Sequence, residues 1–362
     1  MDGIPLDPYH RSVLTESQQL EYLDRLNLAR SLSSSRPSLE LLSQLLLSQL
    51  EEIAKDTTPL HVPEREWNET LNEVDNVIRL SRAFTGMPEG VGAFDRIVRQ
   101  RKGAFCFAIN ATFAALLRSF GFRVSELVAR TFKSLGNDPK THPDGYKWGT
   151  MTHEIMLVDW SDSDARYLVD GAWGPWACPV PIKLADKQVV KGLNDYEAFQ
   201  LVEEVLPLCP KTQTRPIDEI KGWTFSRRIN PPGVPISLPI SDSESESEST
   251  TTTKGYWSPL FHFHLLSIPL LDFRLYHHFS ASHELASFTA FWLVTKLIPN
   301  SGGARRSMMY ADKPGDTQRR AKVYTTGGHE GKGSLEGRDV EYVEMKVDVM
   351  REYLKREFGF GF

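Results

Sequence analysis

Three residues of the sequence have side chains that together could carry out nucleophilic acyl transfer. Cys106 stands in RKGAFCFAIN directly before an expected helix, whose first N–H groups and dipole would stabilise a thiolate. His153 opens an apolar strand-like segment, HEIMLVDW, and Asp170 closes another, RYLVD. An imidazole can take the thiol proton while a carboxylate fixes the tautomer of that imidazole. The sequence therefore predicts a Cys106–His153–Asp170 triad, with His153 and Asp170 on adjacent antiparallel strands.

Each of these residues also has an ordinary structural interpretation. A single cysteine is most often a small buried apolar residue, as Cys106 could be. A histidine at a strand entrance can be a satisfied core residue, and an aspartate at a strand end is a common turn former. The chemical interpretation therefore depends on the three residues acting together.

Four modules are expected to position these residues. Leucine and isoleucine recur at helical spacing from Ser17 to Arg82, with a start signal at Pro37–Ser38. Strand-like segments follow Gly121, and then a Pro-, Ser- and Thr-rich acidic stretch that cannot bury apolar area. The last part mixes strand-like segments with a final helix over 340–358. The predicted modules are a helical bundle over 1–120, a β-rich barrel or sheet over 121–229, a disordered linker over 230–254 and an α/β module over 255–362.

Composition limits the class of protein. Lys and Arg total 42 against 47 Asp and Glu, giving a formal charge of −5, which argues against nucleic acid or an anionic membrane as partner. The three cysteines lack CxxC spacing and favour a reducing compartment. The first residues show no basic start or apolar core of a signal peptide, and the leucine-rich stretch 39–50 is amphipathic. We therefore expect a cytoplasmic protein.

No metal site is expected. His262 and His264 alternate along an apolar segment, and His277 and His278 are adjacent. No carboxylate or cysteine completes a set at ligand spacing in these segments.

The motifs resemble those of one known family, the arylamine N-acetyltransferases. The family's nucleophile motif, approximately R-G-G-x-C-x-E-x-N, is matched by Lys102, Gly103, Cys106 and Asn110. HEIMLV matches its H-x-x-L-x-V strand, and YLVDGAWGPWACPVPIKL matches its L-V-D-V-G-F-G motif and the proline-rich segment after it. Further similar segments, including LLRSFGFRV, LDFRLYHHFSAS and REFGF, extend the resemblance over nearly the whole chain. The chain is thus identified as a diverged, fungal-type member that departs from the pattern at Ala104, Ala108 and Gly171.

The resemblance implies an α+β fold with an N-terminal helical bundle, a central β-barrel and a C-terminal α/β lid around a transglutaminase-like cysteine-triad core. It implies acetyl-CoA as acyl donor, a small arylamine or hydrazine as acceptor, and ping-pong transfer through Cys106. CoA would lie between barrel and lid, with Gly174 and Ser287 as expected contacts. The candidates for an apolar amine-binding slot are Phe105, Trp173, Trp176 and Phe288.

Two other functions remain open from the sequence. A transglutaminase-like amidase or peptidase would use the same triad on amides instead of a CoA thioester. A binding homologue without activity would keep the cleft around an inert, buried Cys106. The acceptor amine, the length of the acyl group and the oligomeric state are not predicted.

Overall fold

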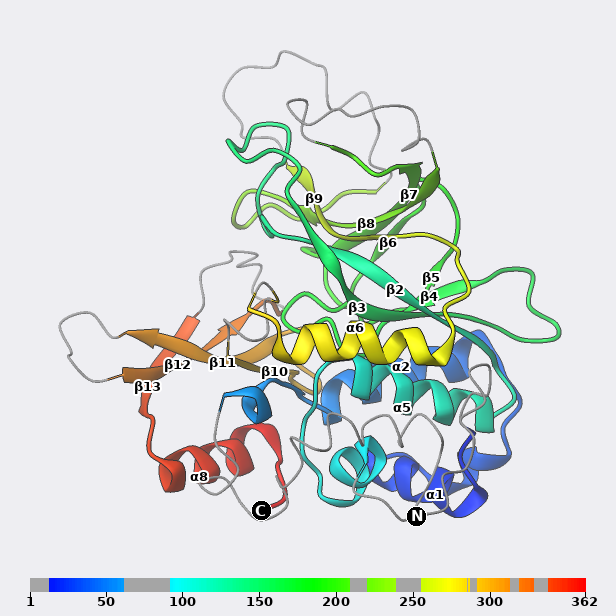
Figure 1. Ribbon diagram of the computed structural model, residues 1–362, viewed down its shortest axis with the longest axis vertical. Coiled ribbons are helices and arrows are strands. Elements are labelled where there is room, and N and C mark those ends of the chain that lie inside the picture. The colour runs from blue at the N-terminus through cyan, green and yellow to red at the C-terminus, as the bar shows by residue number, and fades with distance from the viewer. Residues whose placement is uncertain are drawn as a thin grey trace.

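A computed structural model describes residues 13–61, 92–208, 220–238, 255–284, 286, 292–312, 319–328 and 338–362 of the chain (Figure 1). Helices of the N-terminal part lie beneath an eight-stranded antiparallel sheet, and a five-stranded antiparallel sheet with its own helix stands beside them. The predicted α+β class is confirmed.

The N-terminal helices begin where short polar side chains cap them. In front of α1 (Glu16–Arg25), the Thr15 hydroxyl accepts a hydrogen bond from the Gln18 N–H, and the Gln18 side chain accepts one from the Thr15 N–H. The Ser38 hydroxyl accepts from the Leu41 N–H at the start of α2 (Leu39–Glu52), which confirms the predicted helix start. Short helical turns occupy η1 (Arg30–Ser34), η2 (Thr58–Leu60) and η4 (Asp95–Arg99).

Helix α5 (Cys106–Ser119) is the central helix of the main core. Every side chain from Cys106 to Leu117 is buried, as expected for a helix that is apolar on all faces. It packs against α1 and against strands of the eight-stranded sheet. Gly121, with φ +93°, follows its last turn and confirms the predicted stop, because a side chain there would be strained. The packing of α5 in the core therefore fixes the position of Cys106, the first residue of this helix.

The eight-stranded sheet carries His153 and leads into Asp170. Its strand order is β5-β4-β3-β2-β9-β8-β7-β6, so among the described residues it is open between β5 and β6. Helix α6 (Leu270–Ser282) contacts β3 and crosses the middle of the molecule in Figure 1. The strands are β2 (Arg123–Phe132), β3 (Trp148–Asp159), β4 (Tyr167–Val169), β5 (Ile182–Lys183), β6 (Val189–Lys191), β7 (Ala198–Val205), β8 (Lys221–Ile229) and β9 (Tyr256–Phe263).

The five-stranded sheet has a separate hydrophobic core. Helix α8 (Val347–Phe358) covers this sheet, and its buried Met350 and Leu354 pack with Val294, Met308 and Val323. The order is β1-β10-β11-β12-β13, with strands β1 (Lys55–Asp56), β10 (Leu293–Leu297), β11 (Arg305–Asp312), β12 (Arg319–Thr326) and β13 (Arg338–Glu344). The edge strand β1 comes from the N-terminal part, so this sheet joins segments far apart in sequence.

A buried ion cluster connects the two sheets. Glu197, directly before β7, has its Oε1 2.9 Å from Nη2 of Arg305 in β11 and 3.3 Å from Nη2 of Arg227 in β8. Arg305 also donates hydrogen bonds to the carbonyls of Ala177 and Gly303 at 2.7 Å. Because these charged groups are buried, their contacts with one another must offset the free-energy cost of removing them from water.

Two expected elements differ in the structure. The helix predicted over 340–358 is a strand, β13, followed by α8, because Glu341 and Val343 pair with β12 before the helical pattern begins. The helical pattern predicted from Ser17 to Arg82 is interrupted by β1, and residues 62–91 lie outside the described residues.

The module boundary predicted at residue 255 also differs. Strand β9 pairs with β8 and β2, so it belongs to the eight-stranded sheet and not to the C-terminal module. Within the predicted linker, Ile236 is buried and its N–H donates to the Asp195 carbonyl in the loop between β6 and β7, so this part of the linker is packed against the rest of the molecule. The acidic part of that linker, 239–254, lies outside the described residues. In the part of the chain that the structure describes, no helix is long and apolar enough to cross a bilayer.

Candidate active site

The segment before α5 holds Cys106 in place through backbone contacts. The Asp56 N–H donates to the Ala104 carbonyl at 2.7 Å, and the Ala104 N–H donates to the Ala54 carbonyl at 3.3 Å. Gly103 lies so close to the segment Ala54–Asp56 that an added Cβ would come within 2.5 Å of the Ala54 carbonyl oxygen and 2.6 Å of the Asp56 Cβ. The chain then enters α5 at Cys106, whose thiol is fully buried and lies 3.6 Å from the Thr152 carbonyl oxygen.

Strands β3 and β4 bring His153 and Asp170 together. The two strands are antiparallel neighbours, with Met156 opposite Val169. His153 lies in β3 and Asp170 follows β4, and Nε2 of His153 is 2.6 Å from Oδ2 of Asp170. This geometry agrees with the predicted arrangement of the pair on adjacent antiparallel strands.

Asn110, one turn after Cys106 on α5, fixes the carboxylate. Its Nδ2 donates to Oδ1 of Asp170 at 3.0 Å and to the Glu154 carbonyl at 2.6 Å. Its Oδ1 accepts from the Gly171 N–H at 3.0 Å, and the Ala172 N–H also donates to Asp170. The nucleophile helix is thereby linked to both strands. Sequence analysis noted Asn110 only as a motif position and missed this role.

The buried neighbours set the protonation of the three groups. Burial alone would raise the pKa of the Cys106 thiol, but His153 and the charge of Lys55 outweigh burial and lower it. Burial would lower the pKa of His153, yet Asp170 and Cys106 raise it to about 9. The pKa of Asp170 is lowered against burial by His153 and Asn110. These directions favour a thiolate–imidazolium pair near neutral pH.

The second described cysteine shows the opposite behaviour. Cys178 is also buried, and burial raises the pKa of its thiol. Its Sγ lies 3.2 Å from the Val180 carbonyl oxygen. Burial without a neighbouring imidazole thus favours the protonated form of the Cys178 thiol.

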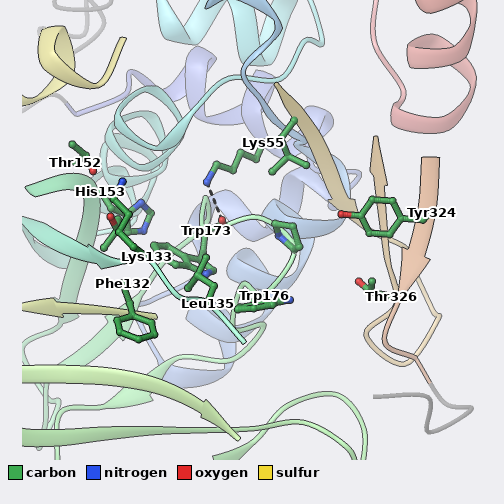
Figure 2. A pocket seen from close by; sticks show the side chains of 13 residues that line it. Lys55, Phe132, Lys133, Leu135, Thr152, His153, Trp173, Trp176, Tyr324 and Thr326 are labelled. Carbon is green, nitrogen blue, oxygen red and sulfur yellow. Dashed lines mark hydrogen bonds between the residues drawn. The ribbon is translucent and has the colours of Figure 1, made fainter. Parts of the chain in front are cut away.

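A pocket of about 460 Å³ opens beside His153, between the two sheets. Figure 2 shows His153 and Thr152 on one side of this pocket and Tyr324 and Thr326 on the other, with Trp173 and Trp176 between them. The pocket is lined by Lys55, Thr131, Phe132, Lys133, Leu135, Thr152, His153, Trp173, Pro175, Trp176, Leu293, Tyr324 and Thr326. Cys106 lies behind this lining, next to His153.

Lys55 is a charged lining residue that sequence analysis missed. It lies in β1, its side chain is buried, and its Nζ donates to the Trp173 carbonyl at 2.9 Å. The pairing of β1 with β10 and the bridge from Lys55 to Ala104 place it there. No local sequence pattern reports these long-range pairings.

We compared the chain with models of known protein families. A family model described as N-acetyltransferase matches residues 91–326, well over half of the chain, and this range contains all three triad residues. The chain belongs to the arylamine N-acetyltransferase family.

Individual family members are distant from this chain. The arylamine N-acetyltransferase of Mycobacterium tuberculosis is 30% identical over 111 residues, covering 31% of this chain and 36% of the relative. The alignment therefore spans little more than a third of that relative's length.

Solved family structures match over a larger part of the chain. The arylamine N-acetyltransferase of Salmonella typhimurium has a TM-score of 0.61 at 18% identity and covers 95% of this chain and 92% of its own. The Mycobacterium marinum enzyme in complex with CoA has a TM-score of 0.57 at 18% identity, covering 94% and 92%. At these identities the match shows the fold.

Only some of the other residues expected from the family line the pocket in the structure. Trp173 packs edge-on against His153, with ring centroids 4.7 Å apart, and it lines the pocket together with Trp176. Gly174, with φ +101°, lies against Lys55 and is not among the lining residues. Phe105 also lies away from the pocket, because its ring stacks on His277 at 5.0 Å. Ser287 and Phe288 lie outside the described residues.

Two departures from the family pattern fit their surroundings. Ala104 is buried and contributes its backbone to the pairing with Ala54 and Asp56. At Gly171 a Cβ would lie 2.9 Å from Cγ of Gln49 and 3.4 Å from Oδ1 of Asn110, so the small residue suits this contact. Ala108 is buried within α5. Among the described residues, no group of three or more His, Cys, Asp or Glu side chains is arranged to hold a metal ion.

Proposed function

We propose that this protein is an acyl-CoA-dependent N-acyltransferase that moves an acetyl or other short acyl group to an arylamine or hydrazine through Cys106, His153 and Asp170. The observation that carries the proposal is the buried His153–Asp170 hydrogen bond of 2.6 Å beside a thiol whose pKa is lowered. Family membership supports the choice of a CoA thioester over an amide as the first substrate.

The first half-reaction acylates Cys106. The thiolate attacks the thioester carbonyl carbon, and the carbonyl electron pair moves onto oxygen. The unpaired N–H groups expected at the start of a helix such as α5 would stabilise that oxyanion. The carbon–sulfur bond to CoA then breaks, the His153 imidazolium protonates the leaving CoA thiolate, and an S-acyl cysteine remains.

The second half-reaction transfers the acyl group to the amine. After CoA has left, His153 is neutral and can accept a proton from the attacking amine. The amine nitrogen forms the amide bond, the bond to the Cys106 sulfur breaks, and the thiolate–imidazolium pair returns. Asp170, held by Asn110, keeps the imidazole oriented through both steps.

The pocket between the sheets is the proposed place for both substrates. Trp173 and Trp176 offer aromatic surface for the amine, next to His153. We propose that the helices act as the bundle, the eight-stranded sheet as the barrel and the five-stranded sheet as the lid, with CoA between the last two. The Gly174 turn belongs to the same region. Free Cys106 and Cys178 are consistent with a protein of the reducing cytoplasm.

The direct test is the mass of the protein after brief incubation with acetyl-, propionyl- and malonyl-CoA, followed by peptide mapping. We expect one acyl group on Cys106, discharged by an added arylamine and absent in Cys106→Ser. Cys178→Ala is the matched control and should acylate as the wild type does, because burial raises the pKa of the Cys178 thiol and no imidazole among the described residues acts on it to lower that pKa. A folded protein that forms no adduct with any donor, or forms one on another residue, would contradict the proposal.

A further inference from the structure

Lys55 places an ammonium group in the pocket wall beside the triad. Its side chain is buried, its Nζ donates to the Trp173 carbonyl at 2.9 Å, and it lies 5.7 Å from the centre of the Trp173 indole. Figure 2 shows the side chain reaching from β1 toward Trp173, on the side of the pocket where His153 lies. The cation is therefore held at the reacting end of the cavity.

The charged side chains that line the pocket are all positive among the described residues. Its described lining residues include two lysines, Lys55 and Lys133, and no aspartate or glutamate. Burial lowers the pKa of Lys55, and the charges of Cys106 and Asp170 oppose this effect. Cys106 and Asp170 both lie behind the lining, so the wall that faces a substrate is cationic.

Acylation changes the charge that Lys55 faces. A thiolate carries a full negative charge, whereas the sulfur of an S-acyl cysteine is neutral. An anionic neighbour of Lys55, the Cys106 thiolate, is thus lost when the acyl-enzyme forms. A carboxylate carried by a substrate would restore a negative charge near the ammonium, in a site where water screens the attraction weakly.

We propose that Lys55 forms an anion subsite that binds a carboxylate on the substrate, either at the far end of a dicarboxylic acyl group or on the ring of an aromatic amine. This inference rests on the proposed acyltransferase function and gives it a substrate class.

The first experimental arm tests the donor. Single-turnover acylation of Cys106 is measured with malonyl-CoA and with butyryl-CoA, a donor of similar length without the carboxylate. A charge-assisted contact of about 1.5–3 kcal/mol predicts that Lys55→Met lowers the malonyl-to-butyryl rate ratio about 10- to 100-fold. Any general effect of Lys55 on the thiolate cancels in this ratio. Lys55→Arg should retain much of the preference.

The second arm tests the acceptor. The acyl-enzyme is discharged by 4-aminobenzoate or by 4-methylaniline, and the ratio of the two rates is compared between wild type and Lys55→Met. A fall in this ratio with an unchanged donor ratio assigns the carboxylate to the amine. The reverse result assigns it to the acyl group.

Lys296 supplies a matched control. It lies in β10, next to the strand partner of Lys55, is half-buried, and does not line the pocket. Lys296→Met should leave both ratios unchanged. If Lys55→Met fails to fold, Lys55→Gln keeps a donor for the Trp173 carbonyl and tests the same charge.

The proposal is overturned if both ratios stay within about twofold of wild type in the Lys55 variants, or if Lys296→Met shifts them equally. Acylation by butyryl-CoA in the same variants keeps this failure separate from failure of the acyltransferase function. Absence of any adduct, in wild type and variants alike, would remove both proposals.

Discussion

At the scale of single residues, two buried cysteines differ because of their neighbours. Cys106 has an imidazole and a lysine beside it, and the pKa of its thiol is lowered against burial. Cys178 lacks an imidazole neighbour among the described residues, and burial raises the pKa of its thiol. The reactive character of Cys106 is thus a property of His153 and Lys55 as much as of the cysteine.

The pH dependence of alkylation should reveal this difference. In the wild type, iodoacetamide should reach its full rate with Cys106 at a pH below the ordinary thiol pKa, because the imidazolium keeps the thiolate populated. Replacing His153 by Gln leaves burial without this opposition, so the inflection should move to higher pH and the rate at pH 7 should fall about 10-fold or more. Above pH about 9, loss of the His153 proton should slow acylation of the wild type.

Stopped alkylation followed by peptide mapping measures both profiles, with Cys178→Ala as the control that should match wild type. An unchanged profile in His153→Gln would show that the imidazole does not activate the thiol.

The sequence was sufficient to select Cys106, His153 and Asp170 as candidates, which lie together in the structure, but not to predict what surrounds them. Cys106 begins α5 and Asp170 directly follows β4, so motif and pattern locate them. His153 was expected to open a strand but lies in the middle of β3, because the residues before it also pair with β2. Lys55, which lines the pocket, pairs with Thr295 and Ala104, and Phe105, which does not line it, stacks on His277 of α6. Both placements depend on contacts between distant segments, which periodicity does not encode.

At the scale of elements, the segment Ala54–Asp56 acts as a template for the loop before α5. It pairs with Ala104 on one side and with β10 on the other. Arg96 strengthens this arrangement by donating to the Gly103 carbonyl at 2.7 Å and to the Asp56 carboxylate at 3.1 Å. The position of the nucleophile therefore depends on a strand of only two residues.

Gly103→Ala should displace this loop. The added methyl would meet the Ala54 carbonyl and the Asp56 Cβ, neither of which can rotate away. We expect a loss of about 1–3 kcal/mol in the free energy of unfolding and slower alkylation of Cys106. Urea denaturation and the alkylation rate measure the two effects.

Gly233→Ala is the comparison variant for this prediction. Its added methyl meets no atom within 4 Å, although its φ of +77° is unfavourable for alanine. This variant should lose stability without any change at Cys106. Equal alkylation rates in the two variants would contradict the proposed role of Gly103.

Element boundaries show why local patterns fail where tertiary pairing intervenes. The sequence of Val347–Phe358 was recognisable as helical. The residues before it form strand β13, because they pair with β12. Strand β9 likewise joins the eight-stranded sheet across the predicted linker. In both cases a distant partner decides the structure.

At the scale of the whole molecule, the pocket exists because two sheets are held at a fixed separation. Lys55, Leu293, Tyr324 and Thr326 come from the five-stranded sheet, and the remaining lining residues come from the eight-stranded sheet and its loops. The Glu197–Arg305 ion pair spans the same junction. A change that weakens this contact between the sheets should therefore also change the shape of the pocket.

Glu197→Gln tests the junction. Removing the carboxylate leaves two guanidinium groups buried without their shared counter-charge, which typically costs about 3–5 kcal/mol. Chemical denaturation should report this loss. Asp195→Asn, which breaks an exposed pair with Lys191, should cost less than about 1 kcal/mol. Similar losses in both variants would mean that the buried cluster has no special contribution.

The pairing of β1 with β10 also affects how the enzyme is made. The Thr57 hydroxyl donates to the Leu293 carbonyl across 236 positions of sequence. At about 5–20 residues per second, a ribosome needs roughly 10–50 s to synthesise that interval. All three triad residues leave the ribosome within this time, before the strand that secures Lys55 exists. The nascent chain therefore contains Cys106 and His153 well before the pocket wall that holds Lys55 can form.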